Sequence, residues 1–387
     1  MARALAGILA LDFSTTIAGP HCARLLADLG AEVIKIEPPE GDIMRARLPT
    51  RNGASAVFGE LNAGKKSIVL DLKRPAAAAA ARRLVRAADV LVENYRPGVM
   101  RRLGLDYEAL APENPRLVYC AISGYGQTGP SALLPAYAPV IHAASGYERA
   151  HLAYQVGRTR PDNSGIFIAD VLAGTYAYGA IMTALYQRQT TGRGQMIDLS
   201  MLETMLGLLL TEVAGAQFEL APAGRSIFGP IEAADGFVTV AVASERTFRA
   251  LCVAAGREDW IDDARFTNYR ERRMNWNHLI DELELWSKAR TSAECLAAFD
   301  AAGVPASAYR TVAEAMCDPQ LAHRGALAEV NDAGGTFKTL NPPFRMSGAE
   351  TSTGTAAASL GEHTEAVLSR AGLAPAEIAA VMERSAR

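Results

Sequence analysis

The sequence lacks the marks of several common protein classes. Its five cysteines lie far apart, with no Cys-x-x-Cys pair and no histidine–cysteine cluster at the spacing of metal ligands. This pattern argues against a disulfide framework and a structural zinc site, and it is typical of a reducing compartment. We therefore expect a cytoplasmic protein without a metal. The sequence also has no run of about 18 uninterrupted apolar residues, so we expect no membrane span.

An excess of positive charge is also missing. The 387 residues carry a formal net charge of −3, which gives no reason to expect nucleic acid or an anionic membrane as a partner. The most basic stretch, residues 265–278, is flanked by acidic residues, so we expect a solvated helix start there. With 49% hydrophobic and 21% charged residues, the composition is that of a globular protein, and the length favours two domains.

Short apolar runs alternate with helical segments over residues 1–125. The apolar runs predict strands at 6–12, 32–37, 67–72, 89–93 and 117–123. This alternation predicts an α/β fold with a mostly parallel sheet that helices cover on both faces. Ligands of such sheets bind where the strands end. The loop after the first strand, residues 14–20, is not G-x-G-x-x-G, so we do not expect a dinucleotide cofactor.

The regular alternation of strands and helices ends at about residue 200. A long apolar segment at 201–218 predicts one helix, and an Ala-Pro-Ala-Gly segment at 221–224 predicts a connection. Strands are expected at 237–243 and 304–308, with helices between them. Irregular structure is expected beyond Pro319, followed by a final helical region after Gly361. We predict a large domain at 1–200, a linker helix and connection at 201–224, a small α+β domain at 225–325 and a return to the large domain at 326–387.

Asp170 stands out because of its place in the pattern. It lies where a short apolar run, residues 165–169, enters a long helix predicted at 171–189. A carboxylate there can accept hydrogen bonds from the first free N–H groups of the helix, and the helix dipole favours its anionic form. One interpretation is a helix N-cap. The other is a carboxylate nucleophile with backbone donors near enough to stabilise an oxyanion, and the spacing alone leaves both open.

Eight short segments resemble motifs of one known family and occur in the same order as in that family. Each is a weak signal alone, but the eight together are a strong one. They are LDFSTTIAGP (11–20), LGAEVIKIEPPEGD (29–42), LNAGKKSIVLDLK (61–73), DVLVENYRPGVMRRLGLDY (89–107), SGYGQTGP (123–130), IADVLAGTYA (168–177), RQTTGRGQMIDLSMLE (188–203) and LGEHTEAVL (360–368). Together they resemble class III CoA-transferases, the family of the formyl-CoA:oxalate and carnitine CoA-transferases. The resemblance implies a Rossmann-like large domain, a smaller α+β domain and a homodimer of two interlocked rings.

The resemblance also implies roles for single residues. Asp170 matches the family's catalytic aspartate, which transfers CoA from an acyl-CoA to a carboxylic acid through aspartyl anhydride and aspartyl-CoA thioester intermediates. Tyr137 and Ile17 match positions in the substrate pocket. Coenzyme A is then part of the substrate, and no tightly bound cofactor is implied. The positions that match CoA contacts are Thr16, Leu72, Lys73, Asn94, Tyr95 and Arg102.

The chain departs from the formyl-CoA type at several points. Ile17 stands in place of a glutamine, Pro38 in place of a basic residue, and a glycine-rich loop is not found near 221–230. These departures argue against oxalate as the acceptor. Four arginines are candidates for the second carboxylate of a dicarboxylic acid, although each also fits a solvated surface position: Arg45, Arg47, Arg158 and Arg160. Transfer between two carboxylates of one substrate stays open.

Two other functions fit parts of the pattern. Alpha-methylacyl-CoA racemases resemble this chain and pair a histidine with an aspartate for acid–base work at a carbon. Their histidine falls on Tyr137 here, and a tyrosine hydroxyl with a pKa of about 10 is a poor partner for that role. His142 and His151 lie nearby in sequence and keep this alternative open. A CoA-binding protein without catalysis is the third class, in which Asp170 would be idle.

Overall fold

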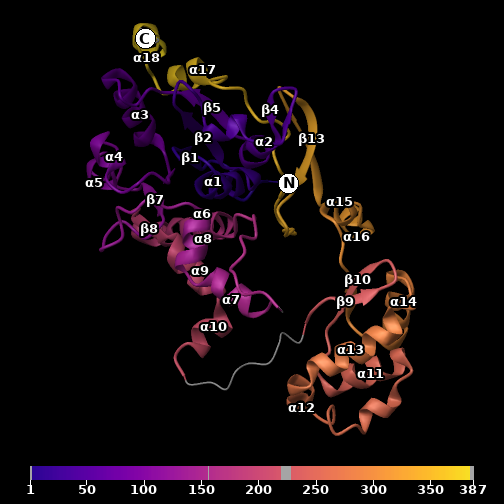
Figure 1. Cartoon of the computed structure of the whole chain (residues 1–387). Helices are drawn as coiled ribbons and strands as arrows, with labels where there is room; N and C mark the ends of the chain where they lie inside the picture. The colour runs from indigo at the N-terminus through magenta and orange to yellow at the C-terminus, as the bar shows by residue number, and fades with distance from the viewer. Residues whose placement is uncertain (1, 156, 219–227, 384–387) are drawn as a thin grey trace. The chain divides into compact units, whose positions relative to one another are not determined.

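The computed structural model describes residues 2–155, 157–218 and 228–383, and the chain packs into two compact units (Figure 1). The first unit joins three separate segments, namely the residues up to 152, residues 159–213 and the residues from 320 onward. The second unit contains residues 153–158 and 214–319. The domain bounds predicted from the sequence stay a prediction, since compact packing does not show which parts fold alone.

A six-stranded sheet forms the centre of the first unit. Its strands are all parallel and lie in the order β5-β2-β1-β6-β7-β8. When the six strands are numbered in the order in which they occur along the chain, their order across the sheet is 3-2-1-4-5-6, as in a doubly wound dinucleotide-binding fold. The α/β class and the parallel sheet predicted from the sequence are therefore confirmed. The strands are β1 (Leu9–Asp12), β2 (Glu32–Glu37), β5 (Lys66–Val69), β6 (Val90–Glu93), β7 (Val118–Ser123) and β8 (Met196–Ser200).

Alternate residues of each strand serve two separate cores. Val90 and Val92 of β6 pack on one face of the sheet, and Leu91 between them packs on the other. The first face is covered by α1 (Ala18–Asp28), α6 (Ala138–Ala144), α8 (Ile168–Thr191) and α9 (Met201–Leu208). The second face is covered by α3 (Pro75–Ala87), α4 (Val99–Arg102), α5 (Tyr107–Leu110), α17 (Thr364–Arg370) and α18 (Pro375–Met382). Burial on both faces explains the almost continuous apolar runs of the strands.

Helix α8 packs one side against the core of the first unit. Ala169, Ala173 and Ala177 pack against the first face, and Gly174 lies so close to α1 that an added Cβ would come within 2.5 Å of the Ala18 carbonyl oxygen. By length and composition α8 also meets the requirements of a membrane span, which core helices meet as well. This resemblance is weak evidence for a membrane.

The C-terminal segment returns to the first strands of the sheet. Figure 1 shows α17 and α18 in yellow beside the indigo β5 and α3. The Val69 amide of β5 donates a hydrogen bond of 3.0 Å to the Thr364 hydroxyl oxygen at the start of α17. The prediction of irregular structure beyond Pro319 is wrong in part, because α16 (Pro319–His323) and a hairpin of β12 (Leu327–Asp332) and β13 (Gly335–Leu340) occupy this region. A two-residue turn, Ala333-Gly334, joins the two strands of this hairpin.

The single helix predicted at 201–218 is two helices. Helix α9 ends at Leu208, and α10 (Leu210–Gly215) follows. Leu209 between them has φ −89° and ψ 55°, which no α-helix contains. Gly207, a weak helix former, precedes the break by two residues.

Smaller elements complete the first unit. A short hairpin of β3 (Thr50–Arg51) and β4 (Ala54–Ser55) leads into α2 (Ala56–Asn62), and a 3₁₀ turn at Ile43–Ala46 precedes it. Helix α7 (Tyr147–Ala153) follows α6 along the chain.

The second unit is built on a three-stranded antiparallel sheet. Its strands are β9 (Ile231–Ala233), β10 (Gly236–Val240) and β11 (Ala306–Ala308), with β10 in the middle. Its helices are α11 (Glu245–Ala255), α12 (Tyr269–Met274), α13 (Trp276–Ser287), α14 (Ser292–Ala302) and α15 (Val312–Met316), with a 3₁₀ turn at Glu258–Ile261. In the basic stretch at 265–278, the buried Arg272 pairs with Glu245 and Arg265 pairs with Asp263 and Glu282.

Candidate active site

Strands β1 and β6 lie side by side at the point where the strand order of the sheet reverses. The chain leaves β1 through Ser14 and Thr15, and it leaves β6 through Asn94 and Tyr95. The Thr15 amide donates to the Asn94 Oδ1 at 2.9 Å, and the Asn94 Nδ2 donates to the Thr15 carbonyl at 2.8 Å. Ligands of doubly wound sheets bind in the crevice at this switch point.

A cavity of about 220 Å³ opens at this switch point. It brings together five residues that the resemblance implies for the site: Thr16, Asn94, Tyr95, Tyr137 and Asp170. They come from the loop after β1, the loop after β6, the residue before α6 and the first turn of α8. Residues distant in sequence therefore meet around one space that is large enough for a thioester group.

Thr16 adopts an unusual backbone conformation in this cavity. Its φ of 62° lies in the left-handed region, which a β-branched residue rarely occupies. Such conformations persist where the surrounding structure fixes them, and they are concentrated at functional sites. The pair of hydrogen bonds between Thr15 and Asn94 fixes the residue just before it.

Asp170 is not the N-cap of α8. Helix α8 begins at Ile168, with Phe167 as its N-cap, so Asp170 is the third residue of the first turn. Burial raises the pKa of its carboxyl group to about 6, and no hydrogen bond to this carboxylate occurs within the described part of the chain. The capping interpretation is therefore wrong. The carboxylate is a partly buried group that lies on a cavity and lacks a protein donor.

The first amides of α8 differ in their partners. The Ile168 amide donates to the Ile166 carbonyl at 2.9 Å, and the Ala169 amide donates to Nε2 of His142 at 3.1 Å. Of the residues that the structure describes, none accepts a hydrogen bond from the Asp170 amide. This amide is therefore available to a ligand oxygen, at the end of the helix where the dipole favours negative charge.

A second cavity of about 440 Å³ lies at the ends of β2 and β5. Leu72, Lys73 and Arg102 line it together with Tyr95, which also lines the cavity at Asp170. Arg102 is exposed, and among residues 2–155, 157–218 and 228–383 no carboxylate pairs with it. Its neighbour Arg101 instead binds Asp106 at 3.0 Å. The six CoA-contact residues implied by the resemblance are thus divided between two cavities that share Tyr95.

A network of buried charged residues contacts the loop after β1. The Lys65 Nζ lies 2.8 Å from Asp12, and the Lys35 Nζ lies 2.9 Å from Asp42. Lys35 also donates to the Ser14 carbonyl at 2.9 Å. Lys65 and Lys35 hold the pKa of Asp12 below its usual range. Sequence reasoning missed this network, although a lysine inside the apolar strand EVIKIE was a visible signal.

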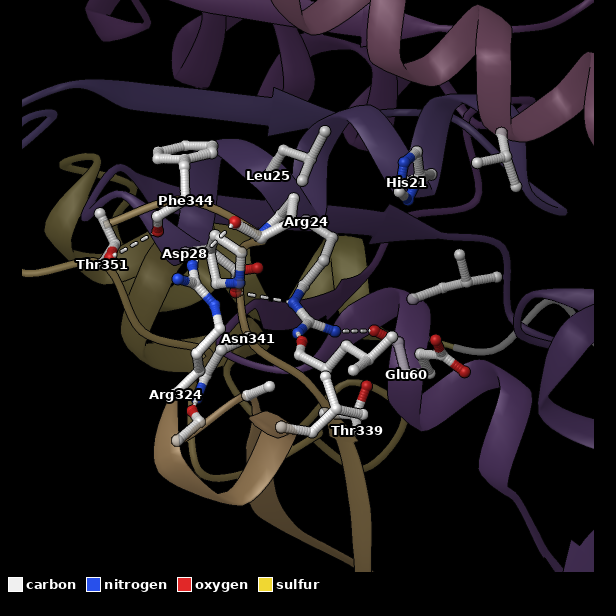
Figure 2. Close-up of a pocket in the computed structure, with 18 of the residues that line it drawn as sticks. His21, Arg24, Leu25, Asp28, Glu60, Arg324, Thr339, Asn341, Phe344 and Thr351 are labelled. Atoms are coloured by element: carbon white, nitrogen blue, oxygen red, sulfur yellow. Dashed lines mark hydrogen bonds and ion pairs between the residues drawn. The ribbon is translucent and has the colours of Figure 1, made fainter. Parts of the chain in front are cut away.

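A third cavity of about 660 Å³, shown in Figure 2, is lined by residues of α1, of α2 and of the segment 321–351. Phe167, the N-cap of α8, and Val171, the residue after Asp170, line this cavity, and so does Ile17. Ile17 therefore lines a different cavity from Tyr137, although the resemblance groups the two. Figure 2 shows the buried Arg24 at this cavity, where it donates to Asp28 and to the Glu60 carbonyl. Its remaining terminal nitrogen donates to the Leu340 carbonyl at 3.1 Å and to Thr353 Oγ1 at 2.5 Å, so all three nitrogens of Arg24 have partners within the protein.

The four candidate arginines have different surroundings. Arg45 forms two hydrogen bonds of 2.7 Å with the buried Glu37, so it is a structural residue and not a candidate for substrate. Arg47 is exposed, and its guanidinium lies 5.4 Å from the ring centre of Phe167. Arg158 belongs to the second unit, and Arg160 lies in an exposed segment before α8. Arg47 is therefore the candidate with a contact beside Asp170.

The three residues of the racemase alternative have different surroundings. Tyr137 lies on the cavity and is 66% exposed. His142 is buried, and its Nε2 lone pair accepts the Ala169 amide. His151 stacks on Tyr147, with ring centres 6.1 Å apart. Among the described residues, no group of three or more His, Cys, Asp or Glu side chains is arranged to hold a metal ion.

Known proteins resemble this chain in sequence and in fold. A sequence model described as CoA-transferase family III matches residues 5–364. Succinate–glutarate CoA-transferase of Agrobacterium fabrum is 33% identical over 94% of each chain, and acetyl-CoA:oxalate CoA-transferase of Acetobacter aceti is 37% identical over 87% of each.

The structural neighbours agree with the sequence comparison. A CaiB/BaiF family protein from Brucella suis superimposes with a TM-score of 0.83 at 31% identity, covering 96% of this chain and all of its own. An aspartate-to-alanine mutant of Rv3272 from Mycobacterium tuberculosis superimposes with a TM-score of 0.84 at 29% identity, covering 95% of this chain and 99% of its own. The chain therefore belongs to CoA-transferase family III, whose members move CoA from an acyl-CoA thioester to a free carboxylic acid.

Proposed function

We propose that this enzyme transfers CoA to a dicarboxylic acid and that Asp170 is its nucleophile. The observation that carries the proposal is the place of Asp170 on the switch-point cavity, with a free backbone amide of its own and no protein donor to its carboxylate. The name of the Agrobacterium relative, succinate–glutarate CoA-transferase, supports a dicarboxylic acceptor. The name of the Acetobacter relative includes oxalate, also a dicarboxylic acid, so the argument against oxalate from Ile17 and Pro38 stays a prediction.

The reaction proceeds in two matched halves. The Asp170 carboxylate attacks the thioester carbonyl of the donor, the C–S bond breaks, and an aspartyl anhydride and CoA thiolate form. The thiolate then attacks the aspartyl carbonyl, which releases the donor acid and leaves an aspartyl-CoA thioester. The acceptor carboxylate repeats these two steps in reverse. No proton is gained or lost overall, so no general base is required.

The backbone of the first turn supports both halves. Negative charge develops on the attacked carbonyl oxygen, and the Asp170 amide is a donor that needs no reorganisation to meet it. A carboxyl pKa of about 6 leaves Asp170 ionised at neutral pH and more basic than an exposed aspartate. Because basicity and nucleophilicity rise together within one class of nucleophile, burial activates the carboxylate.

The CoA portion extends from Asp170 into the cavity at the ends of β2 and β5. Tyr95 is shared by the two cavities, so a pantetheine arm that passes it can connect the thioester to the nucleotide. Arg102 and Lys73 then supply positive charge for the phosphates. No further cofactor is part of this proposal.

Trapping of the covalent intermediate tests the assignment. Incubation with succinyl-CoA and no acceptor is expected to leave CoA on the peptide that contains Asp170, as read by mass spectrometry. Asp170→Ala and Asp170→Asn should lose both adduct and transfer while they still bind CoA, because the nucleotide contacts lie elsewhere. An active wild type that forms no adduct and exchanges the alpha proton of a 2-methylacyl-CoA with deuterated water would overturn the transferase mechanism.

We further propose a homodimer, in keeping with the interlocked rings that the resemblance implies. Seven large apolar side chains are exposed on α8, α9 and α10: Val171, Tyr176, Tyr186, Leu206, Leu208, Leu210 and Val213. An exposed apolar surface of this kind is typical of a protein interface. Light scattering at decreasing concentration should report a dimer throughout, whereas a stable folded monomer would contradict the proposal.

A further inference from the structure

His142 connects α6 to the first turn of the helix that carries Asp170. It is the fifth residue of α6, only 1% of it is exposed, and its Nε2 lies 3.1 Å from the Ala169 amide. The N-cap of α8 is Phe167, whose side chain has no oxygen to accept a helix amide. A histidine from another helix thus performs the work that a serine or aspartate usually performs within the chain.

This hydrogen bond determines the state of the imidazole. Because the Ala169 amide donates, Nε2 must carry a lone pair, and the proton of the neutral ring must lie on Nδ1. The Glu148 carboxylate lies 3.7 Å from Nδ1, too far for a direct hydrogen bond. The Tyr147 ring packs against the imidazole, with ring centres 5.4 Å apart. Burial lowers the pKa of His142 and Glu148 opposes this effect, so the neutral form is favoured.

We propose that His142 is a positioning residue for the reaction at Asp170, acting as an acceptor that fixes the first turn of α8. The inference rests on the proposed role of Asp170. The held amide belongs to the residue directly before Asp170, so its direction sets where the carboxylate and the Asp170 amide point. His142 does not line the cavity and touches no reacting group. A misplacement of about 1 Å at a nucleophile can lower a rate by about 100-fold.

Two neutral amides form a matched pair of test variants. In His142→Gln the terminal amide oxygen can occupy the place of Nε2 and accept the Ala169 amide. In His142→Asn the side chain is one methylene shorter and reaches only the place of Nδ1. The two variants carry the same amide group, and their side chains differ in volume by one methylene. If His142 only fills space in the core, both variants should therefore have similar effects.

The expected result is a loss of kcat in one variant and rescue in the other. His142→Asn should lower kcat and the single-turnover rate of Asp170 adduct formation from succinyl-CoA by about 10- to 100-fold, with the dissociation constant of CoA within twofold. His142→Gln should retain both rates within about threefold. His151→Asn, at the histidine that also stacks on Tyr147, serves as the control and should keep the wild-type kcat.

Several outcomes would overturn the inference. Equal rates of adduct formation in His142→Asn and His142→Gln would contradict the acceptor role. A change in the dissociation constant of CoA without a change in either rate would contradict it as well. If His142→Asn does not fold, a His142→Gln variant with a tenfold lower adduct rate contradicts the acceptor role, and one with the wild-type rate supports it. A wild type that forms no adduct would instead refute the proposed role of Asp170, so the two failures are distinct.

Discussion

Asn94 and Thr15 hold each other through two hydrogen bonds across the point where the sheet reverses its strand order. The Asn94 side-chain oxygen accepts the Thr15 amide, and its side-chain nitrogen donates to the Thr15 carbonyl. The Asn94 side chain thus makes the two hydrogen bonds to the Thr15 backbone that a strand backbone would make if β1 and β6 were longer. The pair fixes the loop that carries Thr16 while leaving the crevice beside it open to ligand.

Removal of this pair should loosen the loop. We expect Asn94→Ala to lower the free energy of unfolding by about 1–3 kcal/mol, because it leaves a partly buried amide and carbonyl of Thr15 without partners. Affinity for CoA should fall as well, since Asn94 and Thr16 line the cavity. Urea unfolding and calorimetric titration with CoA measure the two effects. Asn94→Asp keeps the acceptor but loses the donor, so its stability should lie between those of Asn94→Ala and the wild type.

Two adjacent arginines allow a controlled test of the nucleotide site. Arg102 lines the cavity at the ends of β2 and β5, whereas Arg101 is bound to Asp106. Arg102→Ala should weaken CoA binding by about 1.5–3 kcal/mol, the contribution of a charge-assisted hydrogen bond, and Arg101→Ala should not. Titration with CoA and with dephospho-CoA at two salt concentrations makes the measurement. Equal affinities for the Arg102 variant and the wild type would remove Arg102 from the site.

Burial of Asp170 should make the wild type less stable than the Asp170→Asn variant. The folded protein raises the pKa of this carboxyl from 3.8 to about 6, so the fold disfavours the charged form. The resulting loss of stability is fully present above pH 6 and disappears as the pH falls toward 3.8. We therefore expect Asp170→Asn to be more stable than the wild type by about 1–3 kcal/mol at pH 8 and equal to it near pH 4.

Urea unfolding of the two proteins between pH 4 and pH 8 measures this difference. A stability gain of Asp170→Asn that is the same at every pH would show that the anion is not the cause. Under the proposed role of Asp170, the catalytic rate of the wild type should fall on the acid side with a midpoint near pH 6, because protonation removes the carboxylate anion.

Much of the first unit could be predicted from the sequence because its strands are buried on both faces. Val90, Leu91 and Val92 form an apolar run in which every residue has a core to fill. The strand order could not be predicted from the residues, since alternation of strands and helices does not say which strands are neighbours. The hairpin of β12 and β13 was missed because only Val330 is buried in the strand Leu327–Asp332, so its pattern is mostly polar.

The site shows the limit of sequence reasoning more sharply. Spacing placed Asp170 at a helix start but could not separate a cap from a nucleophile; the structure excludes the cap, and the nucleophile stays a prediction. The structure shows that the helix begins two residues earlier, at Ile168. His142 could not be assigned a role, because its contact with Ala169 joins residues 27 positions apart through two packed helices. Local patterns do not encode such contacts.

Arg47 leads to a prediction about the acceptor. Its guanidinium lies over Phe167, the residue that precedes α8, and no carboxylate pairs with it in the described parts of the chain. An exposed guanidinium that faces the residue before α8 suits the second carboxylate of a diacid. We expect Arg47→Ala to raise KM for glutarate by about 10- to 100-fold, the equivalent of a charge-assisted contact of about 1.5–3 kcal/mol.

A monocarboxylic acid of the same length separates recognition of the diacid from damage to the site. KM for pentanoate should be the same in Arg47→Ala and in the wild type. Pentanoate has no second carboxylate, so it makes no contact that the loss of Arg47 could remove. Arg160→Ala is the matched control, since Arg160 is exposed in the segment before α8 and should leave both KM values unchanged. Arg45 cannot serve, because its removal would leave the buried Glu37 without its partner and lower stability instead. If Arg160→Ala impairs glutarate selectively and Arg47→Ala does not, the second carboxylate binds on the other side of Phe167 and the assignment to Arg47 is wrong.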